Sequence, residues 1–320
     1  MEPNRPKAND GADIASILGP GRPGYQHLPS SASRFPDGVS FRVEIPSVEG
    51  PNCMSAVLSE AARLNVPVRR MSQGSGVMLL TDAELDEMAV MASSNGIEVS
   101  LFARPCAGWG ISAAAMASAG SVFAGSARGL EQLQSVADDM IRAAEHGFRS
   151  ILVSDLGALS MFGQLREGGY LPQDMQAKVS VMLPIANPAT ARVLVDLGAS
   201  TLNLQPDLDV GQISAIRSAV DVPLDIYIES PDNIGGFVRH DELPEIVRVA
   251  APVYIKFGLR NAPDIYPSGS HLDPVAISLS IERVRRAKIG MEVLSRSGAD
   301  MTTSEPGAKG LAIPHVKSPS

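Results

Sequence analysis

The chain has 320 residues, of which 44% are hydrophobic and 4% are aromatic, and its formal net charge is −8. This composition argues against a nucleic-acid or membrane-surface protein, because both need a basic surface, and single strands also need aromatic platforms. The two cysteines, Cys53 and Cys106, are too few for a disulfide framework or for a four-cysteine iron–sulfur cluster. No signal-type segment or run of about 18 apolar residues occurs, so we expect a cytoplasmic protein.

The two ends of the chain differ in composition from its middle. Residues 1–38 are rich in Pro, Gly and Ser and lack periodicity, which predicts a flexible N-terminal arm. Residues 296–320 have the same character and predict a flexible C-terminal tail. The residues between them, 39–295, alternate short apolar strands with amphipathic helices and form the predicted folded domain.

Eight strand-like segments follow one another along this domain, separated by helical segments that often end in Gly or Asn. Eight strands with intervening helices predict an α/β fold, the single-domain (β/α)8 TIM barrel, with an open doubly wound sheet as the alternative. No Gly-rich dinucleotide fingerprint follows the first strand, so no nucleotide cofactor is expected. The predicted strands are 41–46, 68–73, 98–103, 150–155, 179–184, 200–205, 224–229 and 253–258.

Polar side chains occupy every second position in several of these strands. In the segment LDIYIE, Asp225, Tyr227 and Glu229 alternate with aliphatic residues. The helix-facing side of a barrel strand must be apolar, so the polar set is predicted to point into the barrel. Active sites of this fold lie at the carboxyl ends of the strands. The residues predicted at that mouth are Glu44, Arg104, Asp155, Asn203, Gln205, Glu229 and Lys256.

Three carboxylates and one lysine in this set are the candidate catalytic residues. Glu44, Asp155 and Glu229 carry the oxygen ligands that suit a divalent cation, with Mg, Mn or Zn as the candidates. No strand ends in His, so a His-rich zinc site is not expected. Lys256 is a candidate Schiff-base amine or general base, and the alternative is a counter-ion to Glu229.

A second group of residues is predicted to bind the substrate. Arg104 suits a carboxylate or phosphate, because its guanidinium group is planar and donates two parallel hydrogen bonds. Gly235 and Gly236 in one loop, and Arg260 in the next, lie where TIM barrels often bind phosphate. The strand residues that complete this group are Asn203, Gln205 and Tyr227.

Two structural alternatives accompany these assignments. The inward charges also fit a closed lattice of ion pairs that fills the barrel without any catalytic role. The long loop 104–129 consists of small residues and is predicted to be either a lid over the mouth or a surface for a homo-oligomer or a partner protein.

Short motifs in the second half of the chain carry a family resemblance. They are Asp155-Leu156-Gly157 after one strand, Leu197-Gly198-Ala199 before another, Asp207, and a late-strand segment from Lys256 to Arg260. In this order, residues 150–266 resemble the collagenase-like peptidase family, family thirty-two of the unknown-mechanism peptidases. The resemblance implies a peptidase or amidase activity by analogy.

The sequence departs from that family at one position with chemical consequences. Glu229-Ser230 stands where the family has His-Gly before a cysteine-bearing stretch. Several family members bind an iron–sulfur cluster through four cysteines, and these ligands are missing here. We therefore interpret the chain as a divergent relative without a cluster.

These observations lead to one leading hypothesis and two alternatives. We expect a TIM-barrel enzyme, a lyase or hydrolase, that acts on a small carboxylated or phosphorylated metabolite by acid/base or metal-assisted chemistry. The first alternative is a peptidase or amidase of the collagenase-like type. The second is a noncatalytic subunit that binds a small ligand or a partner protein.

Overall fold

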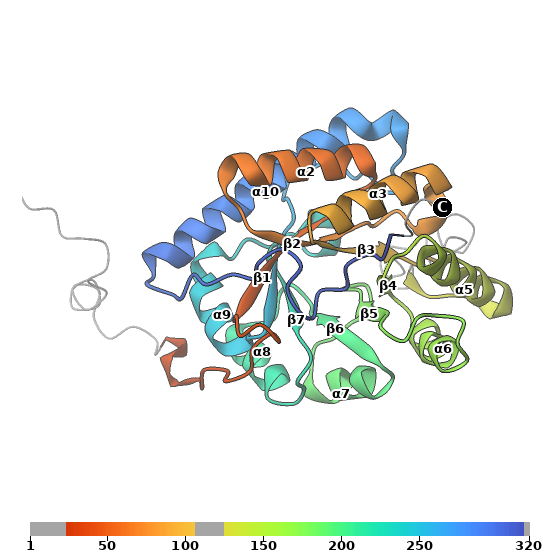
Figure 1. The fold of residues 1–320 in the computed structure, drawn as a ribbon. Coiled ribbons are helices and arrows are strands. Elements are labelled where there is room, and N and C mark those ends of the chain that lie inside the picture. The colour runs from red at the N-terminus through yellow and green to blue at the C-terminus, as the bar shows by residue number, and fades with distance from the viewer. Residues whose placement is uncertain (1–23, 106–124, 317–320) are drawn as a thin grey trace, which may run out of the picture.

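The computed structural model describes residues 24–105 and 125–316. Within them, parallel strands β1 to β8 follow one another in chain order and close into a barrel, in which β8 pairs with β1 (Figure 1). The predicted (β/α)8 barrel is confirmed. The strands are β1 (Phe41–Pro46), β2 (Val68–Ser72), β3 (Glu98–Phe102), β4 (Ser150–Val153), β5 (Gln176–Val179), β6 (Ala199–Asn203), β7 (Leu224–Glu229) and β8 (Val253–Phe257).

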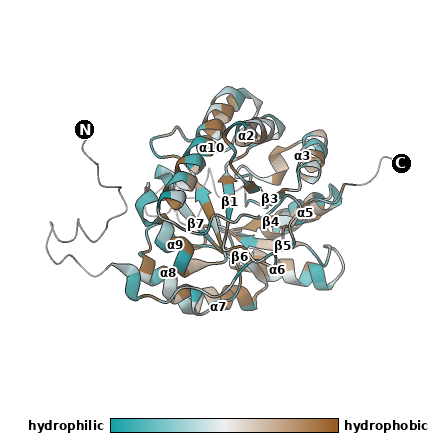
Figure 2. Cartoon of the chain, turned by 60° about the vertical axis from the view of Figure 1, so that its left-hand side comes forward, coloured by the Kyte–Doolittle hydropathy of each residue, from teal (hydrophilic) through white to brown (hydrophobic). Residues whose placement is uncertain are grey.

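The helices surround the ring of strands (Figure 1), and hydrophilic and hydrophobic residues interleave along them (Figure 2). This pattern is expected for helices that pack on one side only. The α-helices of the described residues are α2 (Pro51–Leu64), α3 (Asp82–Ser94), α5 (Gly129–Glu145), α6 (Leu156–Glu167), α7 (Pro188–Asp196), α8 (Val210–Arg217), α9 (Leu243–Ala250) and α10 (Asp273–Arg296). The short 3-10 helices are η1 (Tyr25–His27), η2 (Val77–Leu79), η5 (Asp232–Ile234), η6 (His240–Glu242) and η7 (Ser270–Leu272).

Local sequence signals explain where several helices begin. Thr81 and Glu84 form a reciprocal capping box at the start of α3, and Asp209 and Gln212 form another at α8. At α7, the side chain of Asn187 accepts a hydrogen bond from the third helical backbone N–H. These caps set the point at which each helix begins after the loop that leads to it from the mouth of the barrel.

The main apolar core lies between the strands and the helices, and the barrel interior is largely polar. Val43 and Ile45 of β1 are fully buried on the helix side, whereas Glu44 between them is fully buried inside the barrel. Alternation along β7 likewise sends Asp225 inward and Ile226 outward, and both are buried. The barrel interior is therefore a site for charges, which must be satisfied by one another.

Segments from both chain ends close the bottom of the barrel, opposite the mouth. Phe35 packs edge-on against the Tyr254 ring, with 5.1 Å between ring centroids. Arg42 donates hydrogen bonds to Ser304 Oγ at 2.8 Å and to the Lys309 carbonyl at 2.9 Å. The predicted C-terminal tail comprised residues 296–320, and its described part after α10, 297–316, runs across the ring of strands (Figure 1).

The fifth strand differs from its prediction. The structure has β5 at Gln176–Val179, whereas the sequence pattern predicted residues 179–184. Residues 181–183 form a turn at the mouth instead. The shift places Lys178 inside the barrel, in a segment that the sequence interpretation had left outside any strand.

In the described residues, no helix combines the length and the hydrophobicity needed to cross a membrane.

Candidate active site

A network of buried ion pairs occupies the middle of the barrel. Arg70 of β2 donates to Glu44 Oε2 at 2.7 Å and also bonds to Asp225 of β7. Lys178 of β5 donates to the same two carboxylates, at 2.6 Å to Glu44 and 2.7 Å to Asp225. The four side chains have exposed fractions of 1% or less, so their charges are stabilised by protein groups in place of water.

Hydroxyl groups satisfy the remaining oxygens of these carboxylates. Ser72 donates to Glu44 Oε1 at 2.8 Å, and Thr201 donates to Asp225 Oδ2 at 3.2 Å. Burial alone raises the pKa of Glu44, but Arg70, Lys178 and Lys256 together hold that pKa well below its usual value. Glu44 is therefore ionised at neutral pH and is not poised to exchange a proton.

Lys256 of β8 lies above this network, at the floor of a cavity in the mouth. Its Nζ is 3.5 Å from Glu44 Oε1 and 4.1 Å from the centroid of the Tyr227 ring. In the amide orientation that satisfies both of its groups, Asn203 accepts a hydrogen bond from this Nζ at 2.7 Å. Burial lowers the pKa of Lys256 from 10.5, and Arg70 lowers it as well, whereas Glu44 and Asp225 oppose the shift. The amine therefore loses its proton more readily than an exposed lysine.

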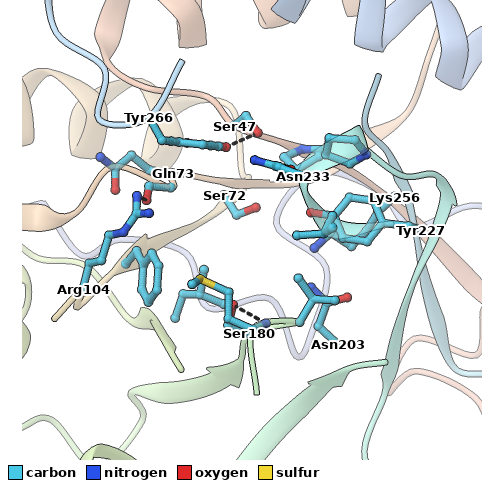
Figure 3. A pocket seen from close by; sticks show the side chains of 18 of the residues that line it. Ser47, Ser72, Gln73, Arg104, Ser180, Asn203, Tyr227, Asn233, Lys256 and Tyr266 are labelled. Carbon is cyan, nitrogen blue, oxygen red and sulfur yellow. Dashed lines mark hydrogen bonds between the residues drawn. The ribbon is translucent and has the colours of Figure 1, made fainter. Parts of the chain in front are cut away.

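The cavity at the mouth has a volume of about 180 Å³. Figure 3 shows Arg104 on one side of it, Tyr227 with Lys256 on the other, and Ser72 between them. Among the described residues that line it, Arg104 and Lys256 are cationic and Asp264 carries a carboxylate. The cavity is thus lined by more positive than negative charge, which favours a small anionic ligand.

Arg104 is held in place at the cavity wall. Its Nη1 donates to the Gly74 carbonyl at 2.6 Å, and its guanidinium carbon lies 5.5 Å from the centroid of the Tyr266 ring. Tyr266 in turn donates a hydrogen bond to Ser47. These contacts come from the loops after β1, β2, β3 and β8, so the wall is assembled from distant parts of the chain.

Glu229 does not share this cavity with Lys256. Its carboxylate accepts a hydrogen bond from the Arg260 backbone N–H at 2.9 Å and lies 3.6 Å from Arg286 of α10. The pairing of β7 with β8 shifts register between Tyr227 and Glu229, and this irregularity breaks the alternation on which the prediction rested. Glu229 therefore fastens the loop after β8 and does not line the mouth.

Asp155 caps a helix. Its Oδ1 accepts from the Ala158 N–H at 3.0 Å at the start of α6, and its Oδ2 accepts from the Ala127 N–H at 3.2 Å. Strand β4 ends at Val153, so Asp155 already lies beyond the strand. Asp155, predicted at the mouth, therefore does not line the cavity.

The three predicted metal ligands do not come together. Glu44 is in the interior network, Asp155 caps α6 and Glu229 binds the loop after β8. Across residues 24–105 and 125–316, no group of three or more His, Cys, Asp or Glu side chains is arranged to hold a metal ion. The predicted ligand set is therefore wrong.

Gly235, Gly236 and Arg260, which were predicted to bind the substrate, lie in the loops after β7 and β8. Arg260 donates to Asp232 Oδ1 at 3.0 Å and so holds η5 against the loop after β8. Gly236 has a φ of +58°, and a Cβ there would lie 2.8 Å from Asp232 Oδ1. Gly235, with a φ of +112°, and Gln205 line a second, neighbouring cavity.

Several residues of the site were not predicted. Lys178 was missed because the fifth strand was placed too late, and Arg70 because the phase of the second strand was ambiguous. Ser47 and Tyr266 lie in loops and Asn233 lies in the short helix η5, where no periodicity signals a direction. The period-two rule applied to 176–179 would have found Lys178.

Comparison with protein families gives one match. The model of peptidase family U32 matches residues 122–230, which confirms the resemblance over that part of the chain. The matched segment includes β4 to β7 and therefore Lys178 and Asp225, but neither Glu44 nor Lys256. Comparison with curated protein sequences gives no match.

Solved structures similar to this chain include two enzymes. A truncated 3-deoxy-D-arabino-heptulosonate 7-phosphate synthase from Thermotoga maritima is 16% identical, with a TM-score of 0.43, over 80% of this chain and 89% of that chain. An oxaloacetate acetylhydrolase in complex with the product oxalate is 12% identical, with a TM-score of 0.44, over 68% of this chain and 76% of that chain.

The loop 104–129, predicted as a lid or a partner surface, lies mostly outside the described residues, and so does Cys106.

Proposed function

We propose that this chain is an enzyme that binds a small carboxylated or phosphorylated metabolite in the mouth cavity and uses Lys256 as its reacting amine. The observation that carries the proposal is the environment of Lys256. Its side chain is 2% exposed, its Nζ faces the Tyr227 ring, and it forms part of the cavity floor. A lysine whose charged form is destabilised by burial is a stronger base and nucleophile at neutral pH.

Binding would rest on the cationic lining of the cavity. Arg104 offers a planar guanidinium from one wall, and the hydroxyl groups of Ser47 and Ser180 face the same space. A volume of about 180 Å³ suits a metabolite of a few carbons with one anionic group. Such a ligand would be held between Arg104 and Lys256.

The chemistry that fits this arrangement is imine formation followed by bond cleavage. The neutral amine of Lys256 adds to a substrate carbonyl carbon, and the carbonyl oxygen leaves as water, which yields a protonated imine. The imine accepts the electron pair of a neighbouring bond as that bond breaks. A C–H bond gives up its proton, and a C–C bond beside a hydroxyl group gives up the hydroxyl proton and releases a carbonyl fragment. Water then hydrolyses the imine, which releases the product and restores the free amine. Burial raises the pKa of Tyr227, so its phenol stays protonated. We assign to this phenol the proton that the departing oxygen needs, and to the resulting phenolate the proton that the substrate gives up in the cleavage step.

Borohydride trapping tests the proposal. The protein is incubated with small 2-oxo acids, namely glyoxylate, pyruvate and 2-oxobutyrate, reduced with borohydride, and analysed by peptide mass mapping. We expect a covalent adduct at Lys256 and none in the Lys256→Met variant. Lys288→Met, at a 37% exposed side chain of α10, is the matched control and should keep the adduct. Labelling spread over surface lysines without an adduct at Lys256 would exclude this chemistry.

The match to peptidase family U32 favours a second candidate, an amidase or peptidase. The described residues that line the mouth cavity include no His or Cys, so none of them supplies a Ser or Cys nucleophile paired with a His base. A Ser hydroxyl activated by Lys256 would be the remaining route. Hydrolysis of N-acyl amino acids that is lost in both Ser180→Ala and Lys256→Met would support it.

A further inference from the structure

A second cavity adjoins the one that holds Lys256. Its volume is about 350 Å³, and it lies beside the carboxyl ends of β5, β6 and β7. The two cavities share four lining residues, Val181 and Met182 after β5 and Asn233 and Ile234 of η5. These four residues therefore contribute to the walls of both cavities.

The two cavities have opposite electrostatic character. The first is lined by Arg104 and Lys256, with Asp264 as its carboxylate. The described residues that line the second cavity include no Lys or Arg, and the charged residue among them is Asp207. Within the described part of the chain Asp207 makes no ion pair, and Gln205 beside it makes no side-chain hydrogen bond. Both groups are therefore available to a ligand.

The rest of the second cavity is apolar. Pro184, Pro206, Ile234 and Phe237 contribute to its walls. A cationic cavity beside an apolar cavity that carries a carboxylate is complementary to a molecule with an anionic head, an apolar spacer and a cationic end. A dicarboxylate of the same length would bring a like charge to Asp207, and a plain alkyl chain would leave Asp207 and Gln205 unpartnered.

We infer that the second cavity is a substrate subsite, and that the substrate class is a 2-oxo acid with an amino group at its far end. Its carboxylate and carbonyl groups would lie in the cavity of Lys256, and its ammonium end would lie at Asp207. This inference rests on the proposed function for the position of the anionic end. It adds a specificity-determining residue, Asp207, which lies outside the cavity of Lys256 and takes no part in imine formation.

The supporting loops explain how the subsite keeps its shape. Asp232 at the start of η5 accepts a hydrogen bond from Arg260 Nε at 3.0 Å and another from the Asn261 N–H. The carbonyl oxygens of Pro206 and Leu208 accept hydrogen bonds from Arg239 Nη1, at 3.0 and 2.7 Å. Both walls of the second cavity are thus fixed by buried or paired arginines.

A titration series on the full chain tests the inference. Binding of pentanoate, 5-aminopentanoate and glutarate, and of their longer homologues, is measured by calorimetry. We expect the amino compound to bind about three- to five-fold more tightly than the alkyl compound, as for one partly exposed ion pair, and glutarate to bind most weakly. Asp207→Asn should abolish the preference without weakening pentanoate. Asp138→Asn, at an exposed position of α5, is the matched control and should leave the preference intact.

The outcomes separate this inference from the proposed function. If the carboxylates bind but the three end groups are equivalent, or if the preference survives in Asp207→Asn, the subsite is excluded and the proposed function stands. If no carboxylate binds at any length, the anionic end is misplaced, and both the proposed function and the subsite fall. Ile234→Ala, at the shared wall, should change the preferred spacer length while retaining the preference for an ammonium end.

Discussion

The ammonium nitrogen of Lys178 lies 2.6 Å from Oε2 of Glu44, although the two residues are 134 positions apart in the chain. Lys178 also bonds to Asp225, and Arg70 bonds to the same two carboxylates. The four residues come from β1, β2, β5 and β7, so their charges are paired only when the barrel has closed. These four inward-pointing residues therefore form a closed lattice of ion pairs, which the sequence analysis gave as the alternative to a catalytic role.

Replacing Glu44 by Gln should strongly destabilise the protein. The change removes the carboxylate that faces Arg70, Lys178 and Lys256 and leaves buried positive charge without a partner. Breaking one side of a buried ion pair costs about 3–5 kcal/mol of unfolding free energy. Urea denaturation monitored by circular dichroism measures this loss.

The control for this change is Glu292→Gln, which removes a carboxylate 3.9 Å from Lys288 on the surface of α10. Surface pairs of this kind contribute at most about 0.5 kcal/mol, so the control should unfold like the wild type. Equal midpoints for the two variants would show that the interior network contributes no more than a surface pair.

The rate of imine trapping at Lys256 should rise with pH and reach its midpoint below 10.5, the value of an exposed lysine. Burial lowers the pKa of Lys256, and only the neutral amine adds to a carbonyl carbon. Reaction is therefore slow while the amine is protonated, and it accelerates as pH rises through the lowered pKa. Initial rates of adduct formation across pH give the midpoint. A midpoint equal to that of a free lysine derivative would contradict a desolvated amine.

Tyr227→Phe should slow imine formation and leave the fold intact. The variant keeps the aromatic ring that faces Lys256 at 4.1 Å and removes only the phenol proton donor. Loss of a general acid lowers a rate by about 100-fold or more. Tyr170→Phe, at a 68% exposed position, is the control and should trap substrate at the normal rate. A normal rate in Tyr227→Phe would remove the phenol from the mechanism.

Asp139→Asn should stabilise the protein at pH 8 and have little effect at pH 4. Burial in α5 raises the pKa of Asp139 from 3.8 to about 6, so folding favours its protonated form. The protonated side chain stabilises the folded state fully below pH 3.8, and this stabilisation is lost as pH rises through about 6. Because Asn mimics the protonated acid, we expect a gain of about 1 kcal/mol at pH 8, allowing for partial solvent screening. Unfolding curves at both pH values, with Asp138→Asn alongside, measure it, and a gain of equal size at pH 4 would contradict the assignment.

The fold could be predicted from sequence because alternation and helix signals repeat eight times along the chain. The same alternation correctly directed Glu44, Asp225 and Lys256 into the barrel. It failed for Glu229, because a register shift in β7 is a backbone irregularity that no residue type announces. It also missed Lys178, because the fifth strand was predicted at 179–184 and Lys178 lies just before that segment.

The site could be predicted less completely than the fold, and the physical reason is different. Which inward charges are neutralised, and which face a cavity, depends on contacts between strands far apart in sequence. Glu44 and Lys256 were predicted as similar mouth residues, yet Glu44 is enclosed by Arg70, Lys178 and Ser72, whereas Lys256 lines the cavity. The second cavity depends on η5 and on the loops after β5 and β6, whose directions carry no periodic signal.

Glu229→Gln tests whether this carboxylate supports the loop after β8, as the structure indicates, or takes part in catalysis, as the sequence predicted. In the structure Glu229 accepts the Arg260 N–H and lies 3.6 Å from Arg286, outside the cavity of Lys256. Weakening these buried interactions should lower the unfolding free energy by about 1–3 kcal/mol, the cost of an impaired hydrogen bond to a charged group. The rate of imine trapping at Lys256 should stay within about two-fold of the wild-type rate. A change of about two-fold corresponds to a smaller change in activation free energy than the loss of one hydrogen bond. Lys256→Met should show the reverse, with trapping abolished. The two variants are compared by urea unfolding and by borohydride trapping, and loss of trapping in Glu229→Gln at unchanged stability would return this carboxylate to the reaction.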